Sequence, residues 1–250
     1  MGALAAVMYR EGKIRATNVT FIFWDLVYPL AYLLVFGVGM TAMGLTAPGT
    51  GVDYNAFFLG GVLGMASFGI ASNTAWSFFM DRDNGIFYEM LTYPMSRAEY
   101  LLGKALFNLL IAVGQATTTV LLAAMVLGVP VRWVGVPLLV AAVLMGTAGW
   151  FFFYAIFALV IRRNDAFNTV TSVFYFVFLF ASSMFYPIEP LPESFRAVAL
   201  ANPITWHVDV LRYASIGVGA PMQIAVEGVA FMGFSAASFA GALWALSREP

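Results

Sequence analysis

The chain has 250 residues, of which 62% are hydrophobic and only 10% are charged, and its mean hydropathy is +0.86. Soluble domains carry about 25% charged residues, so this composition excludes a soluble domain and indicates a polytopic membrane protein. The sequence has no cysteine, one histidine and a net charge of −1. These values exclude disulfides, cysteine nucleophiles, a histidine-rich metal site and a basic surface for nucleic acid.

Residues 1–24 are predicted to be an amphipathic helix on the membrane surface. Leu4 and Val7 lie on one face of this helix, whereas Arg10 and Arg15 can reach anionic lipid. A frayed tail is the alternative, because the pattern is short. The basic residues follow the apolar run, which is the reverse of a secretory signal, so no such signal is expected.

Six apolar stretches are long enough to cross a membrane as helices. They cover residues 26–45, 56–80, 101–127, 136–161, 166–186 and 223–246. The connections place nine of the twelve Lys and Arg residues on one side, so the positive-inside rule puts both termini in the cytoplasm. The sequence thus predicts an all-α polytopic membrane protein with six transmembrane helices in a single domain, 1–250.

The most polar segment, 81–104, joins the second and third spans. Its charges would have no partners in hydrocarbon, so we expect it in water or at the membrane surface. Residues 86–91 form a predicted short amphipathic helix that starts after Gly85. Ser96, followed three residues later by Glu99, predicts a capping box that begins the next helix.

The connection between the fifth and sixth spans, 187–222, is too long and too patterned for a simple turn. A proline cluster ends the fifth span, and Asn202-Pro203 breaks the chain again between two short apolar segments. Each segment is too short to span a membrane. We therefore expect an external re-entrant helical hairpin, whose broken tip must lie against protein or water.

These two connections together resemble those of the ABC type-2 exporter permeases, drug-resistance type. In the first connection the resemblance is carried by Asp81-Arg82, Gly85, Glu89, Leu91, Pro94, Ser96, Glu99 and Gly103-Lys104. In the second it is carried by Pro187, Leu191-Pro192, Asn202-Pro203 and Arg212. Asp81 stands where glutamate is usual, which keeps the charge. The resemblance covers nearly the whole chain.

The resemblance implies a transport subunit, not an enzyme, in a bacterial-type inner (plasma) membrane. Segment 81–100 would be the cytosolic coupling loop that docks on a separate ATPase. Its coupling residues would be Arg82, Gly85, Ile86, Phe87, Glu89, Met90 and Leu91, with the apolar ones inserting into a groove of the ATPase. The chain has no phosphate loop, so ATP and Mg would bind to two copies of that partner.

The resemblance also implies a homodimer, or a pair of this chain with a closely related permease, that exports a lipophilic or amphipathic substrate by alternating access. A lipid-linked polysaccharide or glycolipid is the alternative substrate. Phe174 and Phe178 share one face of the fifth span, which with Ser182 would border the pathway; lipid contact or core packing is the other interpretation. The remote alternatives are a membrane-embedded enzyme and a secondary transporter, for which paired mid-membrane carboxylates and inverted repeats are missing.

Five polar residues have structural explanations. Asp209 and Arg212 are three residues apart and are expected to pair on one helix face. His207 is interpreted as a structural residue at the membrane edge, with a proton switch as the alternative. Asp25 is expected to cap the first span, and Glu227 to reach the interface. No catalytic residue and no metal site is expected.

Overall fold

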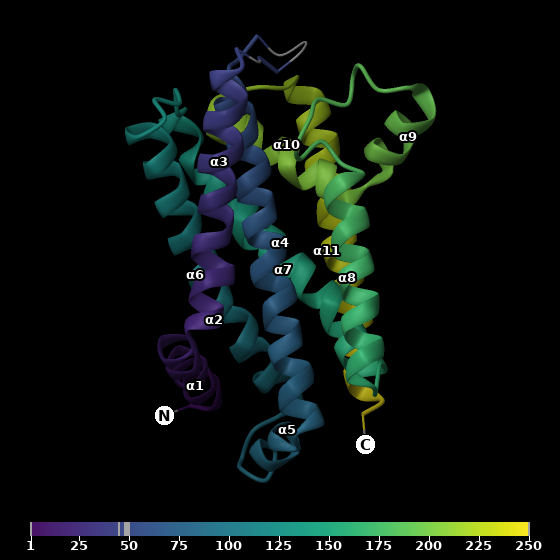
Figure 1. Cartoon of the computed structure of the whole chain (residues 1–250). Helices are drawn as coiled ribbons and strands as arrows, with labels where there is room; N and C mark the ends of the chain where they lie inside the picture. The colour runs from purple at the N-terminus through teal and green to yellow at the C-terminus, as the bar shows by residue number, and fades with distance from the viewer. Residues whose placement is uncertain (1, 45, 48–50, 250) are drawn as a thin grey trace.

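The computed structural model describes residues 2–44, 46–47 and 51–249, and within them the chain forms helices and no strand. Figure 1 shows long helices running side by side along one direction. The elements are α1 Ala3–Thr17, α2 Val19–Ile22, the π-helical turn η1 Phe23–Val27, α3 Tyr28–Ala42, α4 Tyr54–Asp83, α5 Ile86–Met90, α6 Arg97–Met125, the 3-10 turn η2 Trp133–Gly135, α7 Val136–Val160, α8 Asn164–Phe180, α9 Glu193–Ala201, α10 Pro203–Ile216 and α11 Pro221–Ser247.

Five stretches of the described chain are long and apolar enough to cross a membrane. They are Val19–Ala42, Tyr54–Asp83, Arg97–Met125, Trp133–Val160 and Pro221–Ser247. The predicted fifth span corresponds to α8, which has 17 residues and rises about 26 Å against a hydrocarbon core of about 30 Å. A sixth crossing by α8 therefore stays a prediction.

The first span begins earlier than the sequence predicted. Residues 19–24, expected to belong to a surface helix, continue through η1 into α3, and the Asn18 side chain caps this new start by accepting from the Thr20 N–H at 3.0 Å. Pro29 lacks an N–H for the ladder, and the wide π turn directly precedes it. The predicted end of this span, Leu45, and the external position Thr50 lie outside the described residues.

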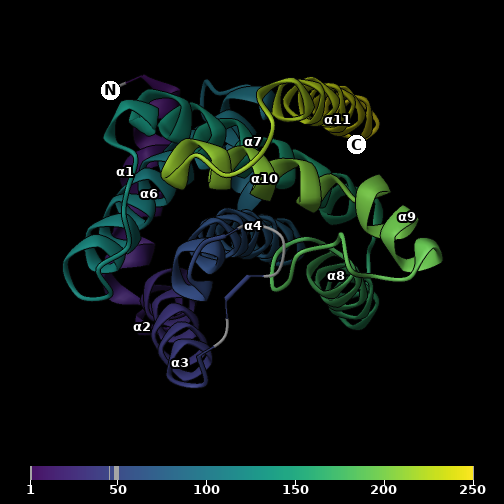
Figure 2. The same cartoon turned by 90° about the horizontal axis from the view of Figure 1, so that it is seen from above.

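Helix α4 is the central element, and Figure 2 shows it surrounded by other helices. It packs against α3, α6, α7 and α10. Gly60 and Gly64 lie four residues apart on α4, a spacing of small residues that allows a close helix approach. A Cβ on Gly60 would lie 2.7 Å from Arg212 Cβ, and one on Gly64 would lie 2.5 Å from Val208 Cγ2, so α10 is the helix that approaches.

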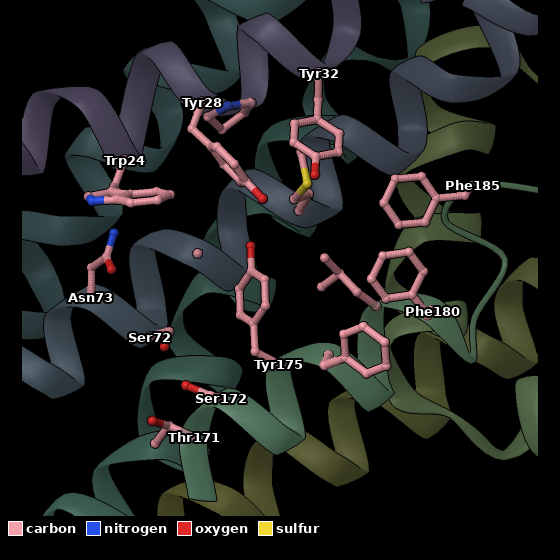
Figure 3. A pocket seen from close by; sticks show the side chains of 15 residues that line it. Trp24, Tyr28, Tyr32, Ser72, Asn73, Thr171, Ser172, Tyr175, Phe180 and Phe185 are labelled. Carbon is pink, nitrogen blue, oxygen red and sulfur yellow. The ribbon is translucent and has the colours of Figure 1, made fainter. Parts of the chain in front are cut away.

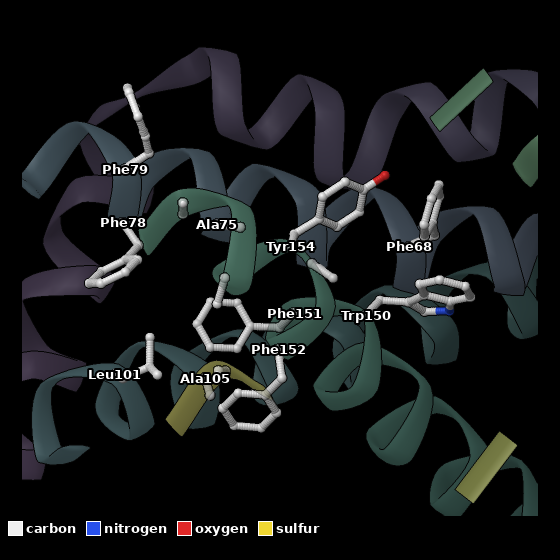
Figure 4. Packing of buried hydrophobic residues seen from close by; sticks show 14 of the residues in the cluster. Phe68, Ala75, Phe78, Phe79, Leu101, Ala105, Trp150, Phe151, Phe152 and Tyr154 are labelled. Atoms are coloured by element: carbon white, nitrogen blue, oxygen red, sulfur yellow. The ribbon is translucent and has the colours of Figure 1, made fainter. Parts of the chain in front are cut away.

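Aromatic side chains fill the space between α4 and α7. Trp150 and Tyr154 of α7 are fully buried, and Phe68 of α4 lies edge-on to Trp150 with ring centroids 4.7 Å apart. Figure 4 shows this packing continuing along the two helices to Phe78 and Phe151. The rings therefore hold α4 and α7 at a fixed distance along most of their length.

Helix α8 ends at Phe180, six residues before the predicted end of the fifth span. The reason lies in the hairpin, because the Asn202 side chain donates to the carbonyls of Phe178 and Ala181 at 3.0 and 2.7 Å. These bonds satisfy carbonyls that a continuing helix would have used. Asn202 also caps α10 by accepting from the Ile204 N–H. The two short helices around the Asn202-Pro203 break are confirmed, whereas their position in a membrane stays a prediction.

The two chain ends lie at the same end of the bundle. Figure 1 shows N, C and α5 together at its lower end, with α9 at the opposite end. The charged connection and both termini therefore share one side, as the sequence predicted. Which side faces the cytoplasm is a prediction from the charge count alone.

Candidate functional site

The short helix α5 projects from the lower end of the bundle between two long helices. Gly85 starts it with a φ of 79°, in the left-handed region that glycine adopts without strain. Ser96 and Glu99 form the predicted capping box at the start of α6. Glu89 is exposed, and Tyr93 exposes 62% of its surface. The chain therefore presents a small surface, residues 89–94, that a partner can reach.

Phe87 does not belong to that surface. The sequence predicted that its ring inserts into a partner's groove, but Phe87 is 0% exposed. Its ring lies edge-on to Phe78 of α4 and Tyr100 of α6, with centroids 5.5 and 5.3 Å away. The prediction of direct insertion is wrong, since the ring fixes α5 to the two helices beside it. Met90 and Leu91 are partly buried against the same core, and Ile86 is also partly buried.

Arg82 is also buried, contrary to the prediction that it would lie in water or at the membrane surface. It is 5% exposed and donates to the carbonyl of Leu159 at 2.5 Å and to Glu249 Oε1 at 3.3 Å. The hydroxyl of Tyr88 donates to Glu249 Oε2 at 3.0 Å, and burial together with this hydrogen bond raises the pKa of Tyr88. Glu249 thus ties the end of α11 to α4 and α5, an arrangement we call the Glu249 clasp.

A buried charge cluster holds α1 against the same region. Lys104 of α6 is 0% exposed, and its Nζ lies 2.6 Å from both Glu11 of α1 and Asp81 of α4. The Tyr100 hydroxyl donates to Asp81 at 2.6 Å, as does Arg10 of α1. Burial lowers the pKa of Arg10, but its hydrogen bond to Asp81 and the Asp81 charge outweigh this, so the net shift is upward. The expectation that Asp81 and Lys104 lie in water is wrong.

Helix α1 forms as predicted, but Arg10 and Arg15, which were expected to reach lipid, pair with acidic residues of the protein. Val7, Glu11 and Arg15 form its buried stripe. Arg15 forms an ion pair with Asp25, which in turn accepts from the Asn73 amide at 2.8 Å. Asp25 is 4% exposed, so it is a buried ion-pair partner and not the expected interfacial cap. The surface position predicted for residues 1–24 stays a prediction for α1, because residues 19–24 continue into the first span.

An open aromatic groove runs between η1, α3, α4 and α8. Its lower part, of about 480 Å³, is lined by aromatic rings and by small polar groups such as Asn73. Figure 3 shows Tyr28, Tyr32 and Tyr175 directing their hydroxyls toward one another inside it. Its upper part, of about 570 Å³, shares Tyr32 and Phe185 with the lower part and continues toward Leu191. The groove therefore offers both apolar faces and hydrogen-bonding groups along one path.

The predicted pathway residues lie outside this groove. Phe174 and Phe178 do share a face of α8, with centroids 5.6 Å apart, but that face packs against Phe153 of α7. Ser182 is 0% exposed and donates to the Leu179 carbonyl at 2.6 Å. The face of α8 that lines the groove instead carries Tyr175. Tyr175 was missed from the sequence because the prediction followed the spacing of the phenylalanines in this segment.

At the opposite end of the bundle, hydrogen bonds from Arg212 join the hairpin to α4. Arg212 forms the predicted ion pair with Asp209 and donates to the carbonyls of Phe57 at 3.1 Å and Ser183 at 2.8 Å. Pro187 and Glu189 lie beside this pair around a small cavity of about 80 Å³. Pro203 begins α10 in its first turn, where its missing N–H is tolerated. Arg212 therefore joins the hairpin to two separate parts of the bundle.

His207 and Glu227 are both buried inside the bundle, and their places at the membrane edge stay predictions. His207 stacks on Phe231 with centroids 4.8 Å apart, its Nε2 is 3.1 Å from the Ala142 carbonyl, and Trp150 Nε1 lies 3.4 Å from its Nδ1. Glu227 is 6% exposed and accepts from the Gln223 amide at 2.9 Å. These contacts support the structural interpretation of His207.

Comparison with known proteins identifies the family to which the chain is similar. The model of the family described as "ABC-2 type transporter" matches residues 2–216. The protein named "Putative transport permease ycf38" of Porphyra purpurea is 22% identical over 189 residues, which cover 75% of this chain. Its namesake in Pyropia yezoensis is 23% identical over the same length. The match spans 65% of the length of each relative.

Proposed function

Because the chain belongs to the ABC-2 type transporter family, we propose that it is the membrane-spanning subunit of an ATP-driven exporter. The observation that carries the proposal is the family match over residues 2–216, which includes the whole α5 region. In this proposal ATP and Mg bind to a separate ATPase subunit, and this chain supplies the pathway through the membrane.

The ATPase docks at the α5 end of the bundle. The supporting geometry is that α5 joins α4 directly to α6, so a push on residues 89–94 moves two long helices. Phe87 transmits the push as an internal packing contact with both helices. The Glu249 clasp carries it further to α11. Arg82 acts within the clasp and does not touch the partner.

Two copies of the chain assemble with two ATPase subunits, and the aromatic groove faces the second copy. In a single chain the groove is open, and its rim exposes large rings: Trp24 is 47% and Phe176 is 63% exposed. A second copy would convert the groove into a closed path. Alternating access would then open this path first to the cytoplasmic side and then outward as the ATPases close.

The groove favours an amphipathic substrate. Its rings offer apolar contact, while Tyr28, Tyr32 and Tyr175 converge their hydroxyls at one level. Tyr28 and Tyr32 already hydrogen-bond to each other, and a polar group of the substrate can join them, whereas a purely lipophilic substrate offers no such group. A lipid-linked saccharide is the second candidate. Sugar rings can stack on the aromatic rings along the groove, and sugar hydroxyls can hydrogen-bond to the tyrosine hydroxyls.

Site-specific photocrosslinking tests the docking proposal. A photoreactive phenylalanine analogue at Tyr93, exposed at the α5 end, is expected to crosslink to the co-expressed ATPase. The matched control is the same analogue at Phe195 of α9, which is 69% exposed at the opposite end. Crosslinks from Phe195 but not from Tyr93 would overturn the assignment of the α5 end as the docking surface.

A further inference from the structure

The aromatic groove is polar at its lower end and largely apolar at its upper end. The lower part is lined by four small polar side chains, which are Ser72, Asn73, Thr171 and Ser172. In the upper part, Tyr54 and Tyr186 donate their hydroxyl protons to backbone carbonyls, and most of the remaining lining is apolar. This difference between the two ends gives the groove a direction.

Asn73 provides a hydrogen-bond acceptor at the polar end. Its amide nitrogen donates to Asp25 Oδ1 at 2.8 Å. Because an ionised carboxylate only accepts hydrogen bonds, the amide oxygen must point away from Asp25. Figure 3 shows this oxygen on the side of the groove, beside Trp24. No described residue donates to it, and Asn73 is only partly buried, so a molecule in the groove can reach it and supply the donor.

The lining of the groove also selects the charge of a ligand. The described residues that line its two parts carry no charged side chain, so no cation there can pair with an anionic group. The ion pair of Asp25 with Arg15 lies outside this lining. Three rings follow one another along the wall, Trp24, Tyr28 and Tyr32, with successive centroids 5.1 and 4.8 Å apart. The faces of such rings attract cations, so a cationic group is favoured over an anionic one.

From these observations we infer that the groove binds amphiphilic cations whose head group carries N–H donors, and that it binds them in one direction. The ammonium head donates to Asn73 Oδ1 and lies against the Trp24 ring. The alkyl tail extends into the upper part past Phe185. Asn73 is then the residue that selects the head group. The inference rests on the proposed function in one respect, since it takes the groove as the substrate site.

Binding to the purified full chain in lipid nanodiscs tests the choice of head group without the ATPase or ATP. The probe is radiolabelled dodecylammonium, and empty nanodiscs give the background. Dodecyltrimethylammonium has the same charge and tail but no N–H, so it should compete at least tenfold more weakly. Dodecanol and dodecyl sulfate should compete at least tenfold more weakly as well. Equal competition by the trimethyl compound would overturn the role of the donor, and equal competition by either of the others would overturn the preference for a cation.

A variant without the acceptor tests the role of Asn73. Asn73→Leu should reduce the affinity for dodecylammonium to that for the trimethyl compound, and should change the latter less than twofold. The matched control is Asn168→Leu, an exposed asparagine of α8 outside the groove lining, which should change neither affinity. An unchanged preference for dodecylammonium in Asn73→Leu would overturn Asn73 as the selecting residue. The comparison of probes on the unchanged chain needs no variant, so it decides the head group even if Asn73→Leu fails to fold.

The direction of binding is tested with a dodecylammonium that carries a diazirine at the end of its tail. Labelling is expected on residues 185–191 of the upper part, and labelling of residues 72–73 and 171–172 instead would overturn the direction. Selective binding by a chain that shows no ATP-dependent transport would contradict the proposed function and support the inference. Transport of another amphiphile without saturable binding of dodecylammonium would overturn the inference alone.

Discussion

Removing the charge of Lys104 should severely destabilise the chain. Lys104 is 0% exposed, and its Nζ holds Glu11 and Asp81 at 2.6 Å each. Lys104→Met keeps most of the side-chain volume but leaves two carboxylates buried against each other. Breaking a buried ion pair by removing one partner costs about 3–5 kcal/mol. At about 2–4 °C per kcal/mol for a chain of this size, the melting temperature should fall by about 6–20 °C.

The assay is thermal unfolding in a mild detergent, followed by tryptophan fluorescence and by the fraction that stays monodisperse. Glu11→Gln combined with Lys104→Met should recover part of the loss, because Asp81 keeps its hydrogen bonds to Arg10 and Tyr100. The matched control is Lys13→Met, since Lys13 is an exposed lysine on α1, the helix that carries Glu11. Its effect on the free energy of unfolding should stay within about 0.5 kcal/mol. If Lys104→Met melts like Lys13→Met, the buried cluster does not stabilise the α1 contact.

Three further predictions concern coupling and topology. Glu249→Gln should leave the ATPase complex assembled but lower transport about tenfold, because the lost charge-assisted bond to Arg82 is worth about 1.5–3 kcal/mol; unchanged transport by the purified complex would remove the clasp from the coupling route. Glu89→Ala at the exposed α5 surface should keep assembly in a pull-down yet reduce substrate-stimulated ATP hydrolysis, and normal stimulation would contradict a coupling role. Cysteines at Asn84 and Arg196 should label from inside and outside respectively, and the reverse pattern would overturn the proposed orientation.

Local sequence signals predicted the local structure well. Gly85 predicted the start of α5, and the Ser96–Glu99 pair predicted the start of α6. Both predictions were possible because capping depends on residues within four positions of each other. The Asn202-Pro203 break and the Asp209–Arg212 pair were found for the same reason. Such signals act within one helix turn, so the sequence alone is enough to locate them.

Long-range pairing could not be predicted in this way. Lys104 lies 93 positions from Glu11 and 23 from Asp81, and nothing in the sequence indicates that the three meet. The rule that charges avoid the membrane interior therefore placed Lys104 in water, although a partnered charge can be buried. Phe87 illustrates the same limit, because an amphipathic pattern shows that one face is apolar but not whether this chain or a partner covers it.

The groove face of α8 was missed for a different reason. The run of phenylalanines drew attention to Phe174 and Phe178, but both faces of this helix are aromatic, so periodicity alone could not separate them. Tyr175 lies on the α8 face that lines the groove, and Tyr28 of α3 lines the same groove. A search for tyrosines at matching depth in two predicted spans would have been the better signal, because a hydroxyl in an apolar span needs a polar partner.

The central claim is that this chain exports an amphipathic substrate with energy from a separate ATPase. The most direct test is transport into inside-out proteoliposomes that contain the purified chain, with and without its co-purified ATPase subunit. The account predicts ATP-dependent accumulation of a fluorescent amphiphile only when both subunits are present, and its loss when a tryptophan replaces Ser172 in the groove. ATP hydrolysis by the chain alone, or accumulation that needs no ATPase subunit, would contradict it.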